Sequence, residues 1–358
     1  MSQISSGLRM LGRSVSVRFT GFHRYAGNAR QVCEHIVNEC WNGSYFQTSA
    51  GHFSEFWTRD FGWCVDSLLK LGYRREVLKT LAYALERFSK AGGISTTISP
   101  SGKPFNFPCF APDSLPFLMH ALNSAKAKAL MAEHRDFLEA QAELYGKRVI
   151  DPETGLVADK KFSSIKDGAY RRRSCYDTAM VGMLAKELGR AKIRHSLPDA
   201  KKILMRHYWT GSYFLDDLSG KQHVAGDAQV FPFWTGVITD NKLMKKSFDS
   251  ASDQGLDYPF PLKYTAEKMR ADVLAQRAFA PNYEGNSIWA HMGLLYTMLL
   301  RAIDPVKAKQ HIAAYKNLVE ANRNFFEVYE PDGSRPYRSL CYVSDEGMLW
   351  AANLLTLL

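Results

Sequence analysis

The sequence predicts an all-α protein whose helices form a toroid, with an inner ring of helices inside an outer ring. Apolar residues recur at the three- and four-residue spacing of amphipathic helices through most of the 358 residues, whereas strand-like alternation is confined to short stretches. The connections alternate between short turns and long loops rich in glycine, proline, aromatic residues and carboxylates. If successive helices alternate in direction, every second loop lies at the same end, and the long loops together form one funnel.

About twelve helices follow one another along the chain. In order, the hydrophobic periodicity predicts them at 28–41, 60–72, 75–90, 113–124, 133–147, 176–190, 197–208, 227–238, 241–251, 284–302, 306–325 and 343–358. The long loops are expected at 42–59, 91–112, 149–175, 209–226, 252–283 and 326–342. Because no linker rich in proline or serine interrupts this series, we expect residues 28–358 to form a single domain.

Residues 1–27 are expected to precede this domain as an arm or a short extended segment. The alternation in VSVRF (15–19) favours a strand, and similar short pieces lie near 94–98 and 222–225. The first 33 residues contain no Asp or Glu but carry several serines and the arginines Arg9, Arg13, Arg18, Arg24 and Arg30. That composition is also typical of a mitochondrial transit peptide, so the sequence leaves both interpretations open.

The composition argues against several classes of protein. A hydrophobic content of 46% and a charged content of 23% are normal for a globular protein, and no apolar run reaches membrane-spanning length. The cysteines and histidines lack zinc-binding spacing, so we expect no metal, no cofactor, no disulfide framework and a reducing, cytoplasmic location. The net charge of +10 comes without a nucleic-acid motif, so we expect neither a nucleic-acid nor a membrane partner. An anionic small substrate stays compatible with this charge, and the oligomeric state stays open.

The stretch FWTRDFGW (56–63) combines an adjacent arginine and aspartate with four large aromatic residues. Arg59 and Asp60 can present a guanidinium and a carboxylate to neighbouring hydroxyl groups, while the flanking rings of Trp57 and Trp63 stack against a flat ligand. A structural salt bridge between the two charged residues is the alternative interpretation. The stretch is therefore a candidate for the floor of a pocket that binds a polar ligand.

The long loops also carry carboxylates that are far apart in the sequence. Asp159 and Asp167 lie in the loop at 149–175, and Glu327 and Glu330 lie in the last long loop. Two carboxyl groups that meet in an aromatic funnel are the apparatus of glycoside hydrolysis, in which one protonates the leaving oxygen and the other activates water or attacks directly. Any chain with 36 acidic residues contains such pairs, so the residues alone do not select one.

Five motifs, in this order, resemble elements of the (α/α)6-barrel glycoside hydrolases, which include the alkaline/neutral invertases, glucoamylases, trehalases and mannosylglycerate-type hydrolases. FWTRDFG (56–62) is similar to a Trp/Ile-x-Arg-Asp element at the start of the second helix, and APDSLPFLMHAL (111–122) to a Val-Asp-Ser-Gly element that opens the fourth. SSIKDGAYRRRSCYDTAM (163–180) resembles a Met-Ile-Asp-Arg-Arg loop followed by a helix start that contains a tyrosine. NYEGNSIWAHMGLLY (282–296) and EVYEPDG (327–333) resemble an Asn-Gly-Gly/Ser-Trp element and a Glu-x-Tyr-x-Pro/Asp-x-Gly element.

This resemblance implies an (α/α)6 toroid that hydrolyses a small carbohydrate with inversion and without a cofactor. It implies Asp167 as the general acid and Glu327 as the general base. Asp177 is the rival acid and Glu330 the rival base, although the spacing within EVYEPDG favours Glu327. Glucoamylases use Glu at the acid position, so the aspartate here favours the invertase, trehalase and mannosylglycerate groups.

The same motifs supply the residues expected to bind substrate. These are Trp57, Arg59, Asp60, Asp113, Tyr176, Asp177, Trp234, Tyr283, Asn286, Trp289 and Tyr337. Several have structural alternatives: Asp113 is suited to be a helix N-cap, Asp177 a first-turn carboxylate, and Trp234 and Trp289 core residues. Arg171–Arg173 is either a solvated run or a contact for an anionic aglycone.

Three functions compete. The first is an exo-acting, inverting glycoside hydrolase that releases a terminal hexose, α-glucosyl by expectation, from a disaccharide, a short oligosaccharide or a small glycoside. The second is a sugar epimerase or isomerase on the same barrel, which resemblance associates with paired histidines in the funnel, here His52, His223 and His291. The third is a non-catalytic carbohydrate-binding homologue. The sequence does not select the sugar, the linkage or the aglycone.

Overall fold

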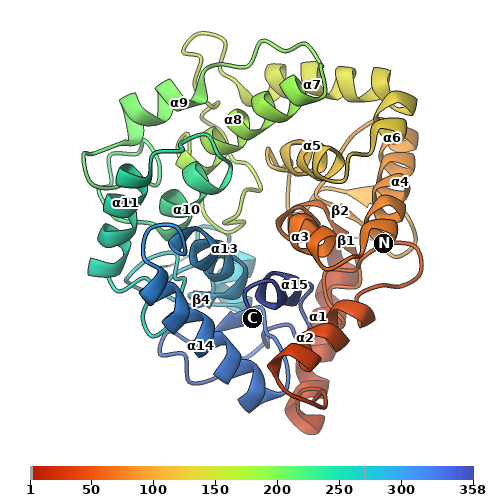
Figure 1. Cartoon of the computed structure of the whole chain (residues 1–358), viewed down its shortest axis with the longest axis vertical. Coiled ribbons are helices and arrows are strands. Elements are labelled where there is room, and N and C mark those ends of the chain that lie inside the picture. The colour runs from red at the N-terminus through yellow and green to blue at the C-terminus, as the bar shows by residue number, and fades with distance from the viewer. Residues whose placement is uncertain (1–2, 270) are drawn as a thin grey trace.

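The computed structural model describes residues 3–269 and 271–358, and its helices form two concentric rings (Figure 1). The inner ring consists of α3 (Thr58–Lys70), α5 (Ser114–Ser124), α8 (Cys175–Arg190), α10 (Gly226–Trp234), α13 (Ala290–Leu300) and α15 (Ala351–Leu355). Each of these helices packs against the next, and α15 closes the ring against α3. The expected all-α toroid of paired helices is confirmed.

The outer ring alternates with the inner ring along the chain. It consists of α2 (Ala29–Glu39), α4 (Arg74–Ala91), α7 (Arg135–Val149), α9 (Ala200–Ile203), α11 (Asn241–Asp253) and α14 (Pro305–Asn322). Outer helices bury one face only: in α4, Val77, Leu81, Leu85 and Phe88 are buried at helical spacing, which is the amphipathic pattern that the sequence showed. A short helix, α6 (Lys128–Glu133), leads into α7, and a π-helical turn (Leu204–Tyr208) extends α9.

The inner helices are buried on nearly all sides, which accounts for their apolar sequences. In α13, AHMGLLYTMLL, nine of the eleven residues are buried. Close packing between inner helices requires a small residue at Gly62 of α3, because a Cβ atom there would lie 2.5 Å from the ring of Phe117 in α5. The barrel interior is therefore a packed core, and any ligand has to bind at one end of the toroid.

Two small antiparallel sheets tie the long loops together at that end. β1 (Phe56–Trp57), β2 (Thr97–Ile98) and β3 (Pro104–Phe105) form one sheet in this order, with Trp57 opposite Thr97. β4 (Ile288–Trp289) pairs with β5 (Val328–Tyr329) in the other, with Trp289 opposite Val328. β1 runs directly into α3 and β4 into α13, so the sheets fix the backbone at the N-terminal ends of two inner helices. The strand expected near 94–98 is present as β2, whereas 222–225 contributes only an isolated bridge at Val224.

The expected strand in the N-terminal segment is wrong, because VSVRF (15–19) belongs to a helix, α1 (Gln3–Thr20). Met10, Ser14 and Val17 are spaced by four and three residues, which places them on one helix face; Ser14 and Val17 are buried and Met10 is half-buried. A five-residue alternation is too short to outweigh that longer helical pattern. The backbone N–H of Val343 donates to the Ser14 hydroxyl at 3.0 Å and helps to hold α1 against the last long loop.

The other expected helices are present with shifted ends. The helix expected at 343–358 is reduced to α15, because residues 343–350 follow an irregular path that carries bridges to two other loops. The helix expected at 284–302 begins only at Ala290, after β4. A short helix, α12 (Leu274–Phe279), interrupts the loop expected at 252–283. All three differences lie at the end of the toroid where the long loops meet.

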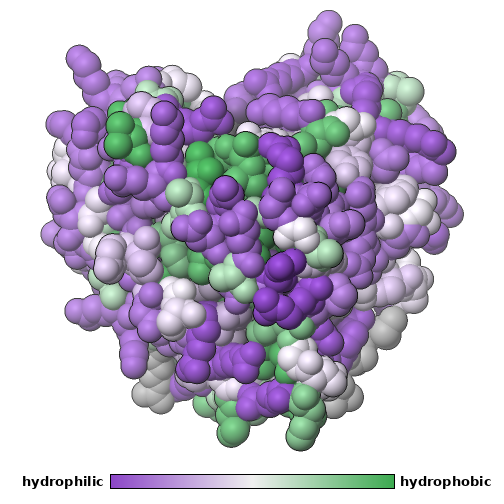
Figure 2. Space-filling view, turned by 60° about the horizontal axis from the view of Figure 1, so that its bottom comes forward, coloured by the Kyte–Doolittle hydropathy of each residue, from purple (hydrophilic) through white to green (hydrophobic). Residues whose placement is uncertain are grey.

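The surface shown in Figure 2 is mostly hydrophilic, with hydrophobic residues visible in smaller patches between hydrophilic ones. Within the described residues, no helix is both long enough and apolar enough to cross a membrane.

Candidate active site

A cavity of about 480 Å³ lies at the end of the toroid where the long loops gather. Its lining comes from the long loops expected at 42–59, 91–112, 149–175, 252–283 and 326–342, and from the N-terminal ends of α3, α13 and α15. Gly7 and Met10 of α1 close one side of it. Five of the six expected long loops therefore contribute to one funnel, and the loop expected at 209–226 contributes none of its described residues to the lining.

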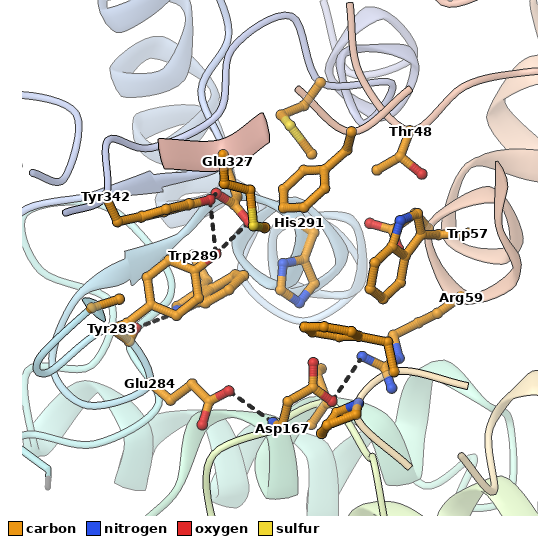
Figure 3. A pocket seen from close by; sticks show the side chains of 18 of the residues that line it. Thr48, Trp57, Arg59, Asp167, Tyr283, Glu284, Trp289, His291, Glu327 and Tyr342 are labelled. Atoms are coloured by element: carbon orange, nitrogen blue, oxygen red, sulfur yellow. Dashed lines mark hydrogen bonds and ion pairs between the residues drawn. The ribbon is translucent and has the colours of Figure 1, made fainter. Parts of the chain in front are cut away.

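Glu327 immediately precedes β5, and its side chain projects into this cavity (Figure 3). Its carboxylate accepts hydrogen bonds from the hydroxyl groups of Tyr283 and Tyr342, the latter at 2.6 Å, and from the backbone N–H of Asp345 at 3.2 Å. Burial raises the pKa of Glu327 to about 7, although these donors favour the ionised form. A carboxylate that is held by neutral donors and titrates near neutrality is suited to accept a proton.

Asp167 lies on the opposite side of the cavity from Glu327 in Figure 3. Its carboxyl group accepts a hydrogen bond from the Ser163 hydroxyl at 2.6 Å, and the Arg59 guanidinium lies 3.9 Å away. Burial raises the pKa of Asp167, and this effect outweighs the charge of Arg59 and the hydrogen bond from Ser163, which both lower it. A raised pKa keeps the group protonated to higher pH, which is what a general acid requires.

The backbone on both sides of Asp167 is anchored to other charged groups. The N–H groups of Asp167 and Gly168 donate to the Glu284 carboxylate at 2.7 and 2.9 Å. On the other side, Lys166 is fully buried, and its ammonium lies 3.1 Å from Asp216 and 3.2 Å from Asp227. These contacts fix the direction in which the loop presents Asp167.

Arg171 completes the buried ion network with Lys166. Its guanidinium lies 3.1 Å from Asp216 and 2.6 Å from Asp227, so two cations are balanced by two carboxylates. The expectation of a solvated run at 171–173 is therefore wrong for Arg171, whose side chain is only 6% exposed. Buried charges are tolerated only when paired in this way.

The adjacent charges of FWTRDFGW do not pair with each other. The Nε of Arg59 donates to Asp113 at 2.6 Å, and its Nη2 donates to the backbone oxygen of Ser163 at 3.1 Å. Asp60 instead accepts a hydrogen bond from the indole N–H of Trp350 at 3.1 Å, and burial raises its pKa to about 7. Arg59 and Asp60 are consecutive residues of α3, so their side chains point in different directions, and both reach the cavity.

Seven of the expected site residues line the cavity: Trp57, Arg59, Asp60, Asp167, Tyr283, Trp289 and Glu327. Six lie outside its lining: Asp113, Tyr176, Asp177, Trp234, Asn286 and Tyr337.

Asp113 and Tyr176 lie behind the cavity wall. Asp113 is fully buried and accepts hydrogen bonds from Arg59 and from the Tyr176 hydroxyl at 2.7 Å, so it holds the arginine from behind and caps no helix with its side chain. The carboxylate of Asp177, the rival acid, accepts hydrogen bonds from the hydroxyl groups of Ser164 and Ser174, both at 2.6 Å.

The remaining three have structural partners of their own. Trp234 packs against Phe117 and Phe231. The side-chain oxygen of Asn286 accepts a hydrogen bond from Asn282 at 2.6 Å. The Tyr337 hydroxyl donates to the backbone oxygen of Pro281 at 2.6 Å. Glu330, the rival base, also lies outside the lining.

His291 is the most informative lining residue that sequence reasoning did not place in the substrate site. Its ring stacks on Trp63 at a centroid distance of 4.1 Å and lies 4.8 Å from Trp350 and 5.3 Å from Trp289. Neither ring nitrogen has a hydrogen-bond partner among the described residues, and burial holds the pKa of His291 well below its usual value, so the ring is neutral. Its position two residues after Trp289, in a motif already identified, was the available signal.

Two indole N–H groups of the lining share this property. The ring nitrogens of Trp57 and Trp63 are buried without a hydrogen-bond partner among the described residues. Buried polar atoms are rarely left unpaired in proteins, so a ligand with several hydroxyl groups suits this cluster.

The histidines considered for an epimerase do not meet in the cavity. His52 lies 3.1 Å from Asp345 and His223 lies 3.5 Å from Asp216, and neither lines the cavity. Among the described residues of the lining, His291 is the only histidine.

Comparison with known proteins shows similarity of fold without recognisable similarity of sequence. No protein-family model and no curated protein matches the sequence. Among solved structures, a wild-type glycosidase aligns with 99% of this chain and 97% of its own at a TM-score of 0.62 and 13% identity. A variant glycosidase in complex with glucose gives a TM-score of 0.63 at 13% identity, with 99% and 97% of the two chains covered.

A third solved structure is the GH63 mannosylglycerate hydrolase from Thermus thermophilus in complex with Tris. The alignment covers 91% of this chain and 98% of the hydrolase chain, with a TM-score of 0.62 and 12% sequence identity. Identities this low establish the architecture alone. The chain has the (α/α)6 toroid fold of these glycosidases, along nearly its whole length.

Proposed function

We propose that the protein is an exo-acting, inverting glycoside hydrolase that releases a terminal hexose, α-glucosyl by preference, from a small glycoside or short oligosaccharide. The observation that carries the proposal is the pair Asp167 and Glu327, which face one aromatic cavity from opposite sides (Figure 3). Two carboxyl groups on either side of a sugar ring are what inverting hydrolysis needs.

In this mechanism Asp167 donates its proton to the glycosidic oxygen as the bond to the anomeric carbon breaks. Glu327 removes a proton from a water molecule on the opposite face, and the water oxygen bonds to the anomeric carbon. The products are a hexose of inverted anomeric configuration and the free alcohol. The reaction leaves Asp167 ionised and Glu327 protonated, and exchange with solvent restores both groups.

The floor of the cavity supports binding of a single sugar ring. Asp60 and Arg59 offer an acceptor and a donor, and His291 offers one of each, because a neutral imidazole has one protonated and one free nitrogen. The rings of Trp63 and Trp289 enclose these groups in apolar surface on which the faces of a pyranose can pack. Neither alternative function gains comparable support, since one histidine in the lining does not provide the pair that an epimerase would use.

A panel of glycosides, scored by NMR for the released sugar and its first-formed anomer, tests hydrolysis, specificity and inversion together. We expect release of one hexose whose initial anomer is opposite to that of the substrate. Retention of configuration would reject the roles of Asp167 and Glu327, and a product of unchanged mass would favour the isomerase. Binding of the sugars without turnover would favour the non-catalytic homologue.

A further inference from the structure

The cavity is built from two chemically different parts. Its floor is formed by residues that are at least nine-tenths buried and carry polar groups, among them Arg59, Asp60, His291 and Glu327. Its mouth is formed by half-exposed residues. Trp57 and Tyr283 each carry one polar side-chain atom, and six others carry none: Met10, Phe53, Phe107, Pro108, Val273 and Phe279. Asp167 is also half-exposed, and its side chain retains 26% exposure. If the floor binds the sugar, the apolar mouth receives the part of the substrate that leaves.

Aromatic side chains make a continuous wall on one side of this mouth. The ring of Trp57 meets Phe53 at a centroid distance of 5.9 Å and 73°, and meets Phe107 at 5.9 Å and 74°. Met10 of α1 and Phe279 of α12 add apolar surface from two further segments. Edge-to-face contacts of this kind are favourable for another aromatic ring.

The mouth has little to offer a second sugar. The hydroxyl groups of a sugar lose hydrogen bonds to water when they are buried, and this costs free energy unless the protein replaces those bonds. The six apolar mouth residues cannot replace them. The Tyr283 hydroxyl already donates to Glu327, so the indole N–H of Trp57 is the one unpaired donor among the described half-exposed residues of the mouth. A disaccharide is therefore poorly matched to this part of the cavity.

None of the described residues that line the mouth carries a positive charge for an acidic aglycone. Arg59 belongs to the floor and not to the mouth, because its side chain is almost fully buried and pairs with Asp113. Arg171, Arg172 and Arg173 each pair with an aspartate, and none of the three lines the cavity. The anionic aglycone that the run at 171–173 left open in the sequence thus has no partner among the described lining residues.

We propose that the leaving-group side of the cavity binds an uncharged aromatic aglycone, so that the substrate is a small glycoside of an aromatic alcohol. The inference rests on the proposed glycosidase function for the position of the sugar. A cavity of about 480 Å³ lies within the range of about 300–1,000 Å³ that is usual for pockets holding drug-sized molecules.

Calorimetric titration of the Glu327→Gln protein, in which turnover is blocked, tests this preference by binding. The ligands share one hexose, the one that the glycoside panel identifies or glucose if it identifies none. Their aglycones are methyl, phenylethyl, glyceric acid and a second glucose. We expect the phenylethyl glycoside to bind about tenfold to a hundredfold more tightly than the methyl glycoside, because the added ring and methylenes are buried. The glyceric acid and glucosyl ligands should gain little over methyl.

Variants of the mouth locate the effect. Phe279→Ser and Phe53→Ser, each in the Glu327→Gln background, should remove most of the phenylethyl preference and leave binding of the methyl glycoside unchanged. Phe19→Ser is the matched control, because Phe19 is 86% exposed on α1 and does not line the cavity. Thermal unfolding establishes that each variant is folded. With two mouth variants, the test can still be made if one of them fails to fold.

The outcomes separate this inference from the proposed function. If the phenylethyl ligand binds more tightly but the wild-type protein hydrolyses no glycoside, the proposed glycosidase function is rejected. The inference that the mouth binds an aromatic group is then kept. Equal or tighter binding of the disaccharide or the glyceric acid glycoside overturns the aromatic aglycone, even if hydrolysis is found. Failure of every ligand in the series to bind rejects both.

Discussion

The carboxyl groups of Glu327 and Asp167 face the same cavity, but their surroundings differ. Neutral donors hold Glu327: the hydroxyl groups of Tyr283 and Tyr342 and a backbone N–H. Asp167 lies instead beside a guanidinium, in a loop whose neighbouring residue Lys166 is locked into a buried ion network. The neutral donors stabilise the ionised form of Glu327 without cancelling its charge. The ion pairs of Lys166 instead fix the backbone of the loop that carries Asp167.

This difference assigns separate tasks to the two regions. The tyrosines act directly on the proton affinity of Glu327, because their hydroxyl groups touch its carboxylate. The ion network acts on Asp167 through the chain, because Lys166 reaches Asp216 and Asp227 and has no hydrogen bond to Asp167. Changes near Glu327 should therefore alter pH dependence, and changes in the network should alter stability.

The largest effect is expected from removing either carboxyl group. Asp167→Asn and Glu327→Gln should each lower kcat by about 10²–10⁴-fold with the fold intact, as measured with an alkyl glycoside. An aryl glycoside with an acidic phenol as leaving group should restore much of the rate in Asp167→Asn, because that phenolate needs no proton. It should not rescue Glu327→Gln. Rescue of both variants, or of neither, would contradict the assignment of acid and base.

The next largest effect is expected in the buried ion network. Lys166→Met leaves Asp216 and Asp227 with one cation in place of two, and should lower the free energy of unfolding by about 3–5 kcal/mol. Denaturant titration measures this loss. The matched control is Lys201→Met in the exposed part of α9, which should change the free energy of unfolding little. If Lys166→Met had the same free energy of unfolding as the wild-type protein, the buried ion network would not stabilise the loop that holds Asp167.

A smaller effect, on pH dependence, is expected at Tyr342. Tyr342→Phe removes a donor that favours ionised Glu327, so the pKa of Glu327 should rise from its value of about 7. Because the base must be ionised, the acidic limb of the pH profile of kcat/KM should move to higher pH by about one to two units. Tyr337→Phe is the control, since its hydroxyl donates to Pro281 and not to Glu327. An unchanged limb in Tyr342→Phe would mean that another group controls it.

The smallest effect is expected at Arg172, one residue from the buried Arg171. Its ion pair with Asp159 joins two partly exposed side chains, at 57% and 26% exposure. Arg172→Ala should change the free energy of unfolding far less than Lys166→Met, because such pairs are screened by water and salt. Comparison with Lys166→Met by the same titration separates buried from exposed ion pairs in one loop. A loss as large as that of Lys166→Met would place Arg172 in the network as well.

The helices and the end of the toroid that carries the site were predictable from the sequence. Apolar spacing located nearly every helix from 28 onward, because burial of one helix face is a local pattern that survives in any tertiary context. The order of the motifs indicated Asp167 and Glu327, and both line the cavity. Local alternation misled at 15–19, where the contacts of a longer helix face decided the outcome.

Only the tertiary structure decided which charged and polar groups meet. Arg59 pairs with Asp113 and not with its neighbour Asp60, and the donors to Glu327 come from Tyr283 and Tyr342 in other segments. The placement of His291 between indole rings, and the apolar mouth assembled from separate loops and α1, are likewise absent from any local pattern. Periodicity records which face of a helix is buried, whereas the partners of a buried polar group depend on loops brought together from distant parts of the chain.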